Sequence, residues 1–203
     1  MRISFGRPNK ALARDLETEN FRLRSLTLLE AMWLTDSWRG DFELLGSMHR
    51  LQRPFTRLEW ARRGPIPNNV TRFAFDIIPK QTGRSIGVHG VHLRDYRSAN
   101  TQIALSDRAW WGRDAVVEVR ARLINHFFRH ADISRFESSV EGRNMAGIFI
   151  YRRLGFAHVG TLHRARRDPV SGRALDVLFF ELLREDWERG PFAEAAPVRE
   201  AGA

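Results

Sequence analysis

The chain has 203 residues, of which 43% are hydrophobic, and a single domain with one core is expected from that length and composition. The absence of cysteine excludes disulfides, thiolate catalysis and cysteine-based metal sites. The formal net charge of +9 comes almost wholly from arginine, and a basic surface of this kind attracts polyanions.

Neither a membrane span nor an export signal is expected. No apolar run approaches the roughly 20 residues that cross a bilayer, and the opening MRISFGRPNK lacks the apolar centre of a secretory signal. We therefore expect a cytoplasmic protein without membrane contact. Composition predicts a flexible N-terminal arm over residues 1–16, a folded domain over 17–187 and a disordered tail over 188–203.

The first half of the chain predicts strands and helices in mixed order. Short runs of alternating apolar and polar residues indicate strands, and apolar residues at helical spacing indicate helices. Gly83 lies between two β-rich runs and suits a hairpin, so these runs should form an antiparallel meander. The predicted elements are a strand at 21–26, helices at 28–38 and 56–63, and strands at 71–78 and 85–93.

The second half predicts a long central helix and a short late one. Between residues 114 and 130, apolar side chains recur with helical spacing, from Val116 to Phe128. The remaining predicted elements are strands at 101–105, 135–140, 156–163 and 174–183, and a helix that begins at Asn144. Together they predict an α/β (α+β) fold with a mixed, mostly antiparallel sheet of about seven strands flanked by about four helices.

The segment NMAGIFIYRRLGF, residues 144–156, carries a helix start, one tyrosine and a helix stop. Asn144 can serve as the N-cap, because its side-chain oxygen can accept an otherwise unpaired backbone N–H. Gly155 suits the left-handed position that ends a helix. Tyr151 lies between them and is one of only two tyrosines in the chain. The segment therefore reads as a short helix that presents a phenol.

This segment resembles the C-terminal signature of the GNAT superfamily of N-acetyltransferases: an Asn, a small residue three positions later, then Tyr-x-x-Leu-Gly-Phe. Asn144, Gly147, Tyr151 and residues 154–156 fill that pattern. The likeness covers about residues 17–187, implies the GNAT fold, and extends to the RimJ/RimL-like branch. The residues that match this branch are Leu23-Arg24, Ile86-Gly87, Ser106-Asp107, Trp110-Trp111-Gly112, Asp176 and Asp186-Trp187.

The resemblance implies acyl transfer from acetyl-CoA, as co-substrate, to a primary amine such as a protein N-terminus or a small amino compound. Tyr151 would give a proton to the departing thiolate, and a phenol of ordinary pKa near 10 is protonated at neutral pH. The alternative is that Tyr151 only packs on the apolar face of its helix with Ile148 and Leu154.

Donor binding in the family relies on main-chain amides at the start of the central helix, with Gly at the fourth position of the motif and Gly or Ala at the sixth. Here these positions hold Asp114 and Val116, and Asp114 could instead cap the helix. A second reading is therefore a GNAT-fold module that is not catalytic, or that uses another acyl donor. The candidate donor-binding residues are Ile103, Leu105, Trp111, Gly112, Arg113, Asp114, Ala115, Val116 and Asn144.

A general base is harder to assign, because residues 99–106 contain no acid. Glu137, His92 and His89 are candidates, each with a purely structural alternative. An α-amino acceptor, whose pKa is near 8, has less need of a strong base. No metal site is expected from the scattered histidines. Nucleic acid is the least favoured partner, and a homodimer stays open.

Overall fold

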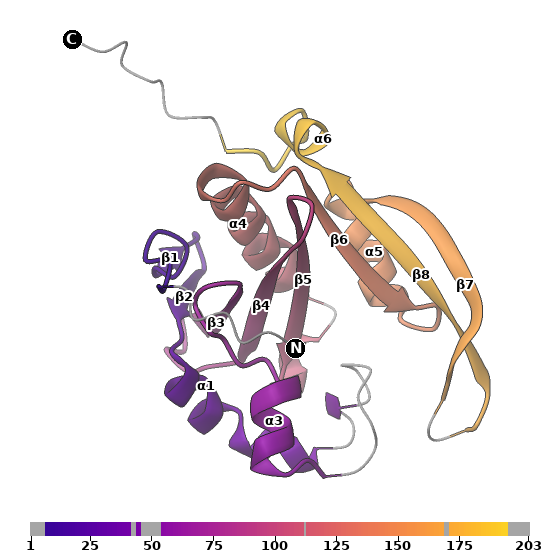
Figure 1. Cartoon of the computed structure of the whole chain (residues 1–203), viewed down its shortest axis with the longest axis horizontal. Helices are drawn as coiled ribbons and strands as arrows, with labels where there is room; N and C mark the ends of the chain where they lie inside the picture. The colour runs from indigo at the N-terminus through magenta and orange to yellow at the C-terminus, as the bar shows by residue number, and fades with distance from the viewer. Residues whose placement is uncertain (1–6, 42–43, 46–53, 112, 169–170, 195–203) are drawn as a thin grey trace.

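One mixed β-sheet organises the chain (Figure 1). The computed structural model describes residues 7–41, 44–45, 54–111, 113–168 and 171–194. Its eight strands lie in the order β1-β2-β3-β4-β5-β6-β8-β7, and every pair is antiparallel except β5 and β6. The strands are β1 (Leu16–Glu17), β2 (Phe21–Ser25), β3 (Arg72–Pro79), β4 (Gly87–Arg94), β5 (Ser98–Leu105), β6 (Arg135–Glu141), β7 (Ala157–Arg167) and β8 (Ala174–Leu183).

The predicted α/β class, mixed sheet and meander are confirmed, and β1 is the one strand beyond the seven expected. The predicted helix at 28–38 is shorter than expected, because its α-helical part ends at Leu34 and a 3₁₀ turn follows. The helical elements are α1 (Leu28–Leu34), η1 (Asp36–Gly40), α3 (Arg57–Arg63), η2 (Arg108–Trp110), α4 (Ala115–His130), α5 (Met145–Arg153) and α6 (Arg184–Glu188). None of the described helices combines the length and apolar character that crossing a bilayer requires.

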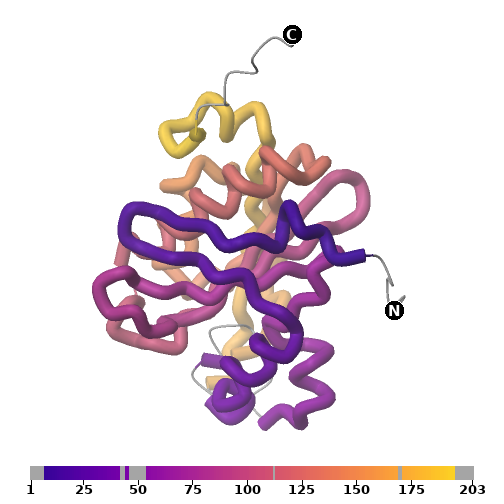
Figure 2. Tube along the Cα trace, turned by 90° about the vertical axis from the view of Figure 1, so that its left-hand side faces the viewer, coloured from indigo at the N-terminus to yellow at the C-terminus, as the bar shows by residue number. Residues whose placement is uncertain are grey.

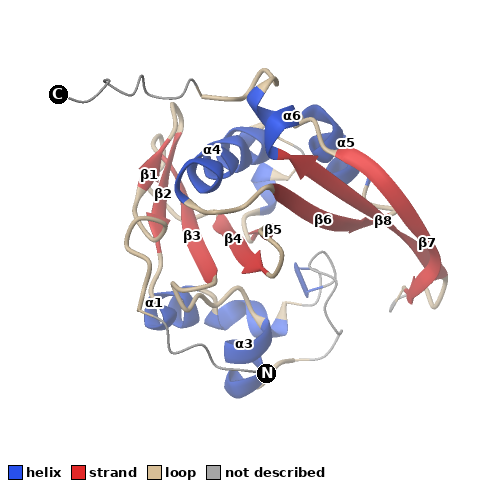
Figure 3. Ribbon diagram, turned by 45° about the horizontal axis from the view of Figure 1, so that its top comes forward, coloured by secondary structure: helices blue, strands red, loops and turns tan. Residues whose placement is uncertain are grey.

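The helices cover opposite faces of the sheet (Figure 3). The central helix α4 packs on one face, where Phe73, Phe127 and Phe136 lie in the larger hydrophobic core. On the other face, α1 and α3 enclose a smaller core around the fully buried Trp60. Trp60 Nε1 donates to Thr35 Oγ1 at 2.8 Å, which ties α3 to the end of α1. The sheet is thereby held rigidly from both sides.

The sheet opens between its two central strands. β5 and β6 pair only where Ser98–Asn100 meets Arg135–Glu137. Beyond that short parallel contact, the half of the sheet made by β6, β8 and β7 diverges from β3, β4 and β5 (Figure 3). Beyond residues 98–100 and 135–137, β5 and β6 therefore do not pair with each other, which leaves an opening between them.

The segment before β2 differs from the expected flexible arm where the structure describes it. Residues 7–16 run across the body of the molecule (Figure 2), and Leu12 is buried in the larger core. His126 Nε2 lies 3.1 Å from the Leu12 carbonyl oxygen and anchors the segment to α4. The burial of Leu12 thus holds in place a segment that composition predicts to be flexible.

Part of the predicted disordered tail is also packed. Asn125 Nδ2 donates to the Phe192 carbonyl oxygen at 2.8 Å, and the Phe192 ring stacks on Trp187 with centroids 6.3 Å apart. The rings of Trp187 and Phe192 shield each other from water. The polar composition of the tail gave no indication of this contact. The rest of the tail, residues 195–203, lies outside the described residues, as do residues 1–6 of the predicted arm.

Candidate functional site

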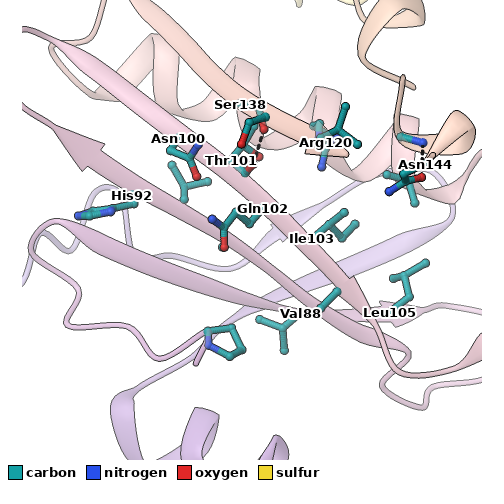
Figure 4. Close-up of a pocket in the computed structure, with 18 of the residues that line it drawn as sticks. Val88, His92, Asn100, Thr101, Gln102, Ile103, Leu105, Arg120, Ser138 and Asn144 are labelled. Carbon is teal, nitrogen blue, oxygen red and sulfur yellow. Dashed lines mark hydrogen bonds between the residues drawn. The ribbon is translucent and has the colours of Figure 1, made fainter. Parts of the chain in front are cut away.

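A cavity of about 930 Å³ lies at the opening between β5 and β6. Its wall takes residues from both strands, from β4, and from the facing sides of α4 and α5. Figure 4 shows His92 and Asn144 at opposite ends of the labelled residues, with Thr101, Ser138 and Arg120 between them. The cavity is therefore a passage that runs along β5.

Tyr151, on α5, lies in the wall of this passage beside Ser138. Its ring is buried between Phe180, at a centroid distance of 5.2 Å, and Phe156, at 5.1 Å. Its hydroxyl makes a short hydrogen bond with Ser138 Oγ, and Ser138 Oγ in turn donates to the Thr101 carbonyl oxygen at 3.1 Å. A hydroxyl has one hydrogen and a carbonyl oxygen only accepts, so the phenol must be the donor to Ser138.

The start and stop of α5 place that phenol. Asn144 Oδ1 accepts from the Gly147 N–H at 2.9 Å, which confirms the predicted N-cap. Gly155 has φ +85°, the left-handed conformation expected at the end of the helix. At Gly147 a Cβ atom would lie 2.9 Å from Val140 Cγ2, so only glycine lets α5 approach β6 this closely. This approach brings Tyr151 within reach of Ser138.

The loop that we expect to bind the donor ends where α4 begins at Ala115. Asp114 occupies the N-cap position, yet its side chain makes no capping hydrogen bond. Its carboxylate pairs with the Arg153 guanidinium instead, and 78% of the side chain is exposed. The alternative that Asp114 caps the helix is therefore wrong, since the side chain turns outward to α5. Val116 is buried in the larger core and also forms part of the cavity wall.

The indole of Trp111 ties the other side of this loop to the end of β5. Trp111 Nε1 donates to the Leu105 carbonyl oxygen at 2.9 Å, and the Arg113 guanidinium lies 5.4 Å from the centroid of the Trp110 ring. Gly112, which we also expected to bind the donor, lies outside the described residues. The indole contact fixes the distance between the loop and the strand along which the cavity runs.

The edge of β5 that faces β6 offers one backbone position in the middle of the cavity. The carbonyl oxygens of Thr101 and Leu105 accept from Ser138 and Trp111. Because peptide groups of a strand point alternately to its two edges, the peptide groups of Ile103 face the same edge between them. Ile103 lies in the cavity wall, so its backbone can pair with an extended ligand there.

The two candidate bases fall in different places. Glu137 is outside the cavity wall, and its carboxylate pairs with Arg94 Nε at 3.3 Å and Arg135 at 3.7 Å. His92 does line the cavity. Burial, followed by the charges of Arg94 and Arg72, lowers the pKa of His92 below 6.5. At neutral pH His92 is therefore uncharged and can accept a proton.

His89, the third candidate, faces the larger core. It is fully buried, and its Nε2 lies 3.2 Å from Thr101 Oγ1. Burial and the charge of Arg120 hold the pKa of His89 well below 6.5. His89 contacts β5 through the Thr101 side chain and does not belong to the cavity wall.

Sequence reasoning missed Ser138 and Arg120, although each left a signal. Ser138 lies between Phe136 and Val140 on the buried face of β6, where alternation predicts an apolar side chain. Arg120 lies four residues after Val116 and three before Leu123, inside the apolar stripe of α4. A polar side chain within an apolar pattern marks a position that folding alone does not explain.

The charge of the cavity wall is strongly positive. Among the described residues of the wall, Glu141 is the single acid, and it pairs with Arg143 at 2.9 Å and Arg166 at 3.9 Å. The arginines of the wall are Arg62, Arg63, Arg72, Arg94, Arg120, Arg143 and Arg166. Such a wall favours ligands that carry negative charge.

Known proteins share this architecture. The Vibrio cholerae spermidine N-acetyltransferase, solved with CoA and spermine, is 17% identical, with a TM-score of 0.69 over 84% of this chain and 99% of that one. RimL, a ribosomal alpha-N-protein acetyltransferase solved with coenzyme A, is 17% identical, with a TM-score of 0.65 over 82% of this chain and 95% of that one. These two likenesses concern the fold.

The sequence comparisons identify the family. A relative from Bacillus licheniformis, named uncharacterized N-acetyltransferase p20, is 29% identical over 180 residues, which are 85% of this chain and 97% of the relative. Residues 20–157, more than half of the chain, match the family described as Acetyltransferase (GNAT) domain. The chain is therefore an N-acetyltransferase of the GNAT family, and its sheet with the opening between β5 and β6 is the GNAT fold.

Proposed function

We propose that this enzyme moves an acetyl group, or a related acyl group, from acetyl-CoA to the primary amine of an acceptor such as a protein N-terminus. The position of Tyr151 carries the proposal, because its phenol lies in the cavity wall where β5 and β6 separate. A thioester that enters along β5 would bring its sulfur to this phenol, and the acceptor would approach from the end where His92 lies.

The reaction is a direct attack. The neutral amine adds to the thioester carbonyl carbon, so that a C–N bond forms, the C–S bond breaks and the electron pair leaves with sulfur. Tyr151 gives its proton to that sulfur and regains one from solvent. His92, the candidate base that lines the cavity, would take the proton that the amine loses, directly or through water.

The donor would lie along β5. Main-chain amides of residues 111–116 would hold its pyrophosphate, since the first N–H groups of a helix have no intrahelical partner. The backbone of Ile103 would pair with the amide groups of the pantetheine arm, and Asn144 would act by capping α5. The outward position of the Asp114 carboxylate, paired with Arg153, supports donor binding over a module that has lost it.

An acceptor without excess positive charge suits this wall best. Arg62, Arg63 and Arg72 lie in the cavity wall, and no acidic partner of theirs is found in the described parts of the chain. A polyamine, such as the spermine bound by the Vibrio cholerae enzyme, would meet these guanidinium groups directly. An α-amino group followed by acidic residues would pair with them. The likeness to RimL, an alpha-N-protein acetyltransferase, and the match to RimJ/RimL-type motifs also support a protein N-terminus as the acceptor.

The test is acetylation of peptides with free N-termini. We expect acetyl-CoA-dependent mass gain on peptides with a free α-amino group, with matching release of CoA thiol. Control peptides carry a blocked N-terminus and one internal lysine, which separates α-amino from side-chain acetylation. Release of no thiol with any peptide or small amine, at saturating acetyl-CoA, would contradict the proposal.

A further inference from the structure

Arg120 is a buried cation in the wall of the donor passage. It lies on α4, only 3% of the residue is exposed, and its guanidinium carbon stands 4.7 Å from the centroid of the Tyr151 ring. Its Nε atom is buried without a hydrogen-bond partner. Within the described ranges, no hydrogen bond or ion pair of Arg120 with another residue is found.

Such an arrangement is unfavourable without a ligand. A guanidinium cannot lose its proton at physiological pH, so burial does not neutralise it. Contact with the face of an aromatic ring compensates only in part. A buried charge that lacks its partner is strongly unfavourable, because the desolvation of the charge is not compensated. The folded protein therefore retains at this point a cation that an anion would complement.

The location limits what this anion can be. Arg120 and Tyr151 both belong to the cavity wall, and Arg120 stacks on the ring whose hydroxyl we place at the thioester. The anion must then belong to the reactive end of the donor, because the phosphates of CoA are expected one helical turn away at residues 111–116. An acetyl group ends in a methyl group, which has neither a negative charge nor a hydrogen-bond acceptor for the guanidinium.

Three sources of negative charge remain: the oxyanion of the tetrahedral intermediate, the thiolate that leaves and a carboxylate on the acyl chain. The oxyanion and the thiolate exist only during or after the transfer, whereas Arg120 is charged and buried throughout. A carboxylate complements it from the moment of binding, and its two oxygens match the planar donors of a guanidinium. A cavity of about 930 Å³ also has room for a chain longer than acetyl.

We propose that Arg120 binds the terminal carboxylate of a dicarboxylic acyl group, so that a donor such as succinyl-CoA is preferred over neutral acyl-CoA donors. The inference rests on the proposed transfer from CoA to an amine and changes only the acyl group. The bonds are those already described: the amine forms an amide with the succinyl carbonyl carbon, the C–S bond breaks, and the distal carboxylate stays unchanged beside Arg120.

Calorimetric titration of the full chain with free CoA, acetyl-CoA, butyryl-CoA and succinyl-CoA tests this inference without any acceptor. Butyryl-CoA and succinyl-CoA both carry four-carbon acyl groups, so they differ in the carboxylate and not in chain length. The native protein should bind succinyl-CoA about 10-fold or more tightly than butyryl-CoA. Equal affinity of the native protein for these two donors would overturn the inference, and this comparison needs no variant.

Two variants assign the preference to the side chain. Arg120→Met keeps an unbranched apolar stem but removes the charge, and should bind the two four-carbon donors equally. Arg120→Lys should keep part of the preference. Thermal unfolding checks that both variants are folded. A preference for succinyl-CoA that survives in Arg120→Met would exclude Arg120 as the carboxylate partner.

The outcomes separate this inference from the proposed function. Binding of free CoA without discrimination among the acyl groups would leave acyl transfer standing and remove the carboxylate site. If Arg120→Met lowers turnover of every donor equally while leaving donor affinities unchanged, Arg120 serves the departing thiolate and the carboxylate site is wrong. Binding of neither CoA nor any thioester would contradict the proposed function itself.

Discussion

Tyr151 donates its phenolic hydrogen to Ser138 Oγ, and Ser138 gives its own hydrogen to the Thr101 carbonyl oxygen across the point where β5 and β6 separate. The short chain of hydrogen bonds therefore joins α5, β6 and β5. To protonate a thiolate, the phenol must turn its O–H away from Ser138. Ser138 then holds the phenol in place and can donate to it once its proton has left.

Ser138→Ala tests this positioning role. Loss of one hydrogen bond of about 1 kcal/mol should lower kcat about 5-fold, with little change in the affinity for acetyl-CoA. In a Tyr151→Phe background the same substitution should have almost no further effect, because both changes remove the same hydrogen bond. Steady-state kinetics of the two single variants and the double variant provide the measurement.

Ser134→Ala is the matched control, because Ser134 Oγ also donates to a backbone carbonyl oxygen, that of Arg97, but lies outside the cavity wall. Its kcat should equal that of the native enzyme. Additive losses of kcat in the double variant would show that Ser138 acts independently of Tyr151.

Asp114 and Arg153 form a pair whose removal should change the affinity for CoA in opposite directions. Arg153→Gln leaves the Asp114 carboxylate uncompensated beside the donor phosphates, so CoA should bind about 3-fold more weakly at low salt. Asp114→Gly should raise the affinity by a similar modest factor, since the native carboxylate is exposed and paired. Titration at low and high salt measures both. A gain in CoA affinity far above 10-fold for Asp114→Gly would mean that Asp114 prevents the native loop from binding the donor.

Arg62, Arg63 and Arg72 in the cavity wall should select against cationic acceptors. A peptide whose free N-terminus is followed by acidic residues should have a kcat/KM about 10-fold above that of a basic peptide, and spermidine should be a poor acceptor. Reversing two charges in Arg62→Glu/Arg63→Glu should remove the preference. Arg57→Glu is the control, because Arg57 lies on the same helix outside the cavity wall and pairs with Asp36 at 3.3 Å. Faster acetylation of spermidine than of the acidic peptide would contradict the electrostatic argument.

His126 should make the protein less stable in mild acid. Burial lowers the pKa of His126 from 6.5 to about 4. The unfolded chain therefore takes up a proton that the folded chain does not, and stability falls as the pH drops from 6.5 towards 4. At pH 5 this loss amounts to about 2 kcal/mol relative to pH 7.5.

His126→Gln cannot titrate but can still donate to the Leu12 carbonyl oxygen. Urea unfolding at pH 7.5 and pH 5 should therefore show a smaller acid loss for this variant than for the native protein. The other histidines titrate in both proteins, so their contribution cancels. An identical acid loss in the two proteins would mean that the pKa of His126 is not depressed.

The sequence predicted the frame of the site well, because that frame depends on local rules. A cap at Asn144, a small residue at Gly147 and a left-handed end at Gly155 are read from residue type and spacing alone, and the structure has all three. The central helix and the meander follow from periodicity in the same way. These elements place the phenol of Tyr151.

What the sequence could not predict depends on contacts between distant segments. The pair formed by Asp114 and Arg153 joins residues 39 positions apart, and it turns an expected helix cap into an outward ion pair. Leu12 reads as part of a loose arm until the structure places it against α4. Arg120 likewise reads as a surface charge unless its position within an apolar stripe is noticed.

A comparison of Tyr151→Phe with Tyr96→Phe tests whether the phenol of Tyr151 protonates the departing thiolate. Tyr96 is the other tyrosine of the chain and is 94% exposed, so it controls for loss of a phenolic hydroxyl. If this phenol is the acid, Tyr151→Phe lowers kcat about 100-fold with an unchanged affinity for acetyl-CoA, while Tyr96→Phe behaves as the native enzyme. An unchanged kcat in Tyr151→Phe would remove the phenol from the mechanism.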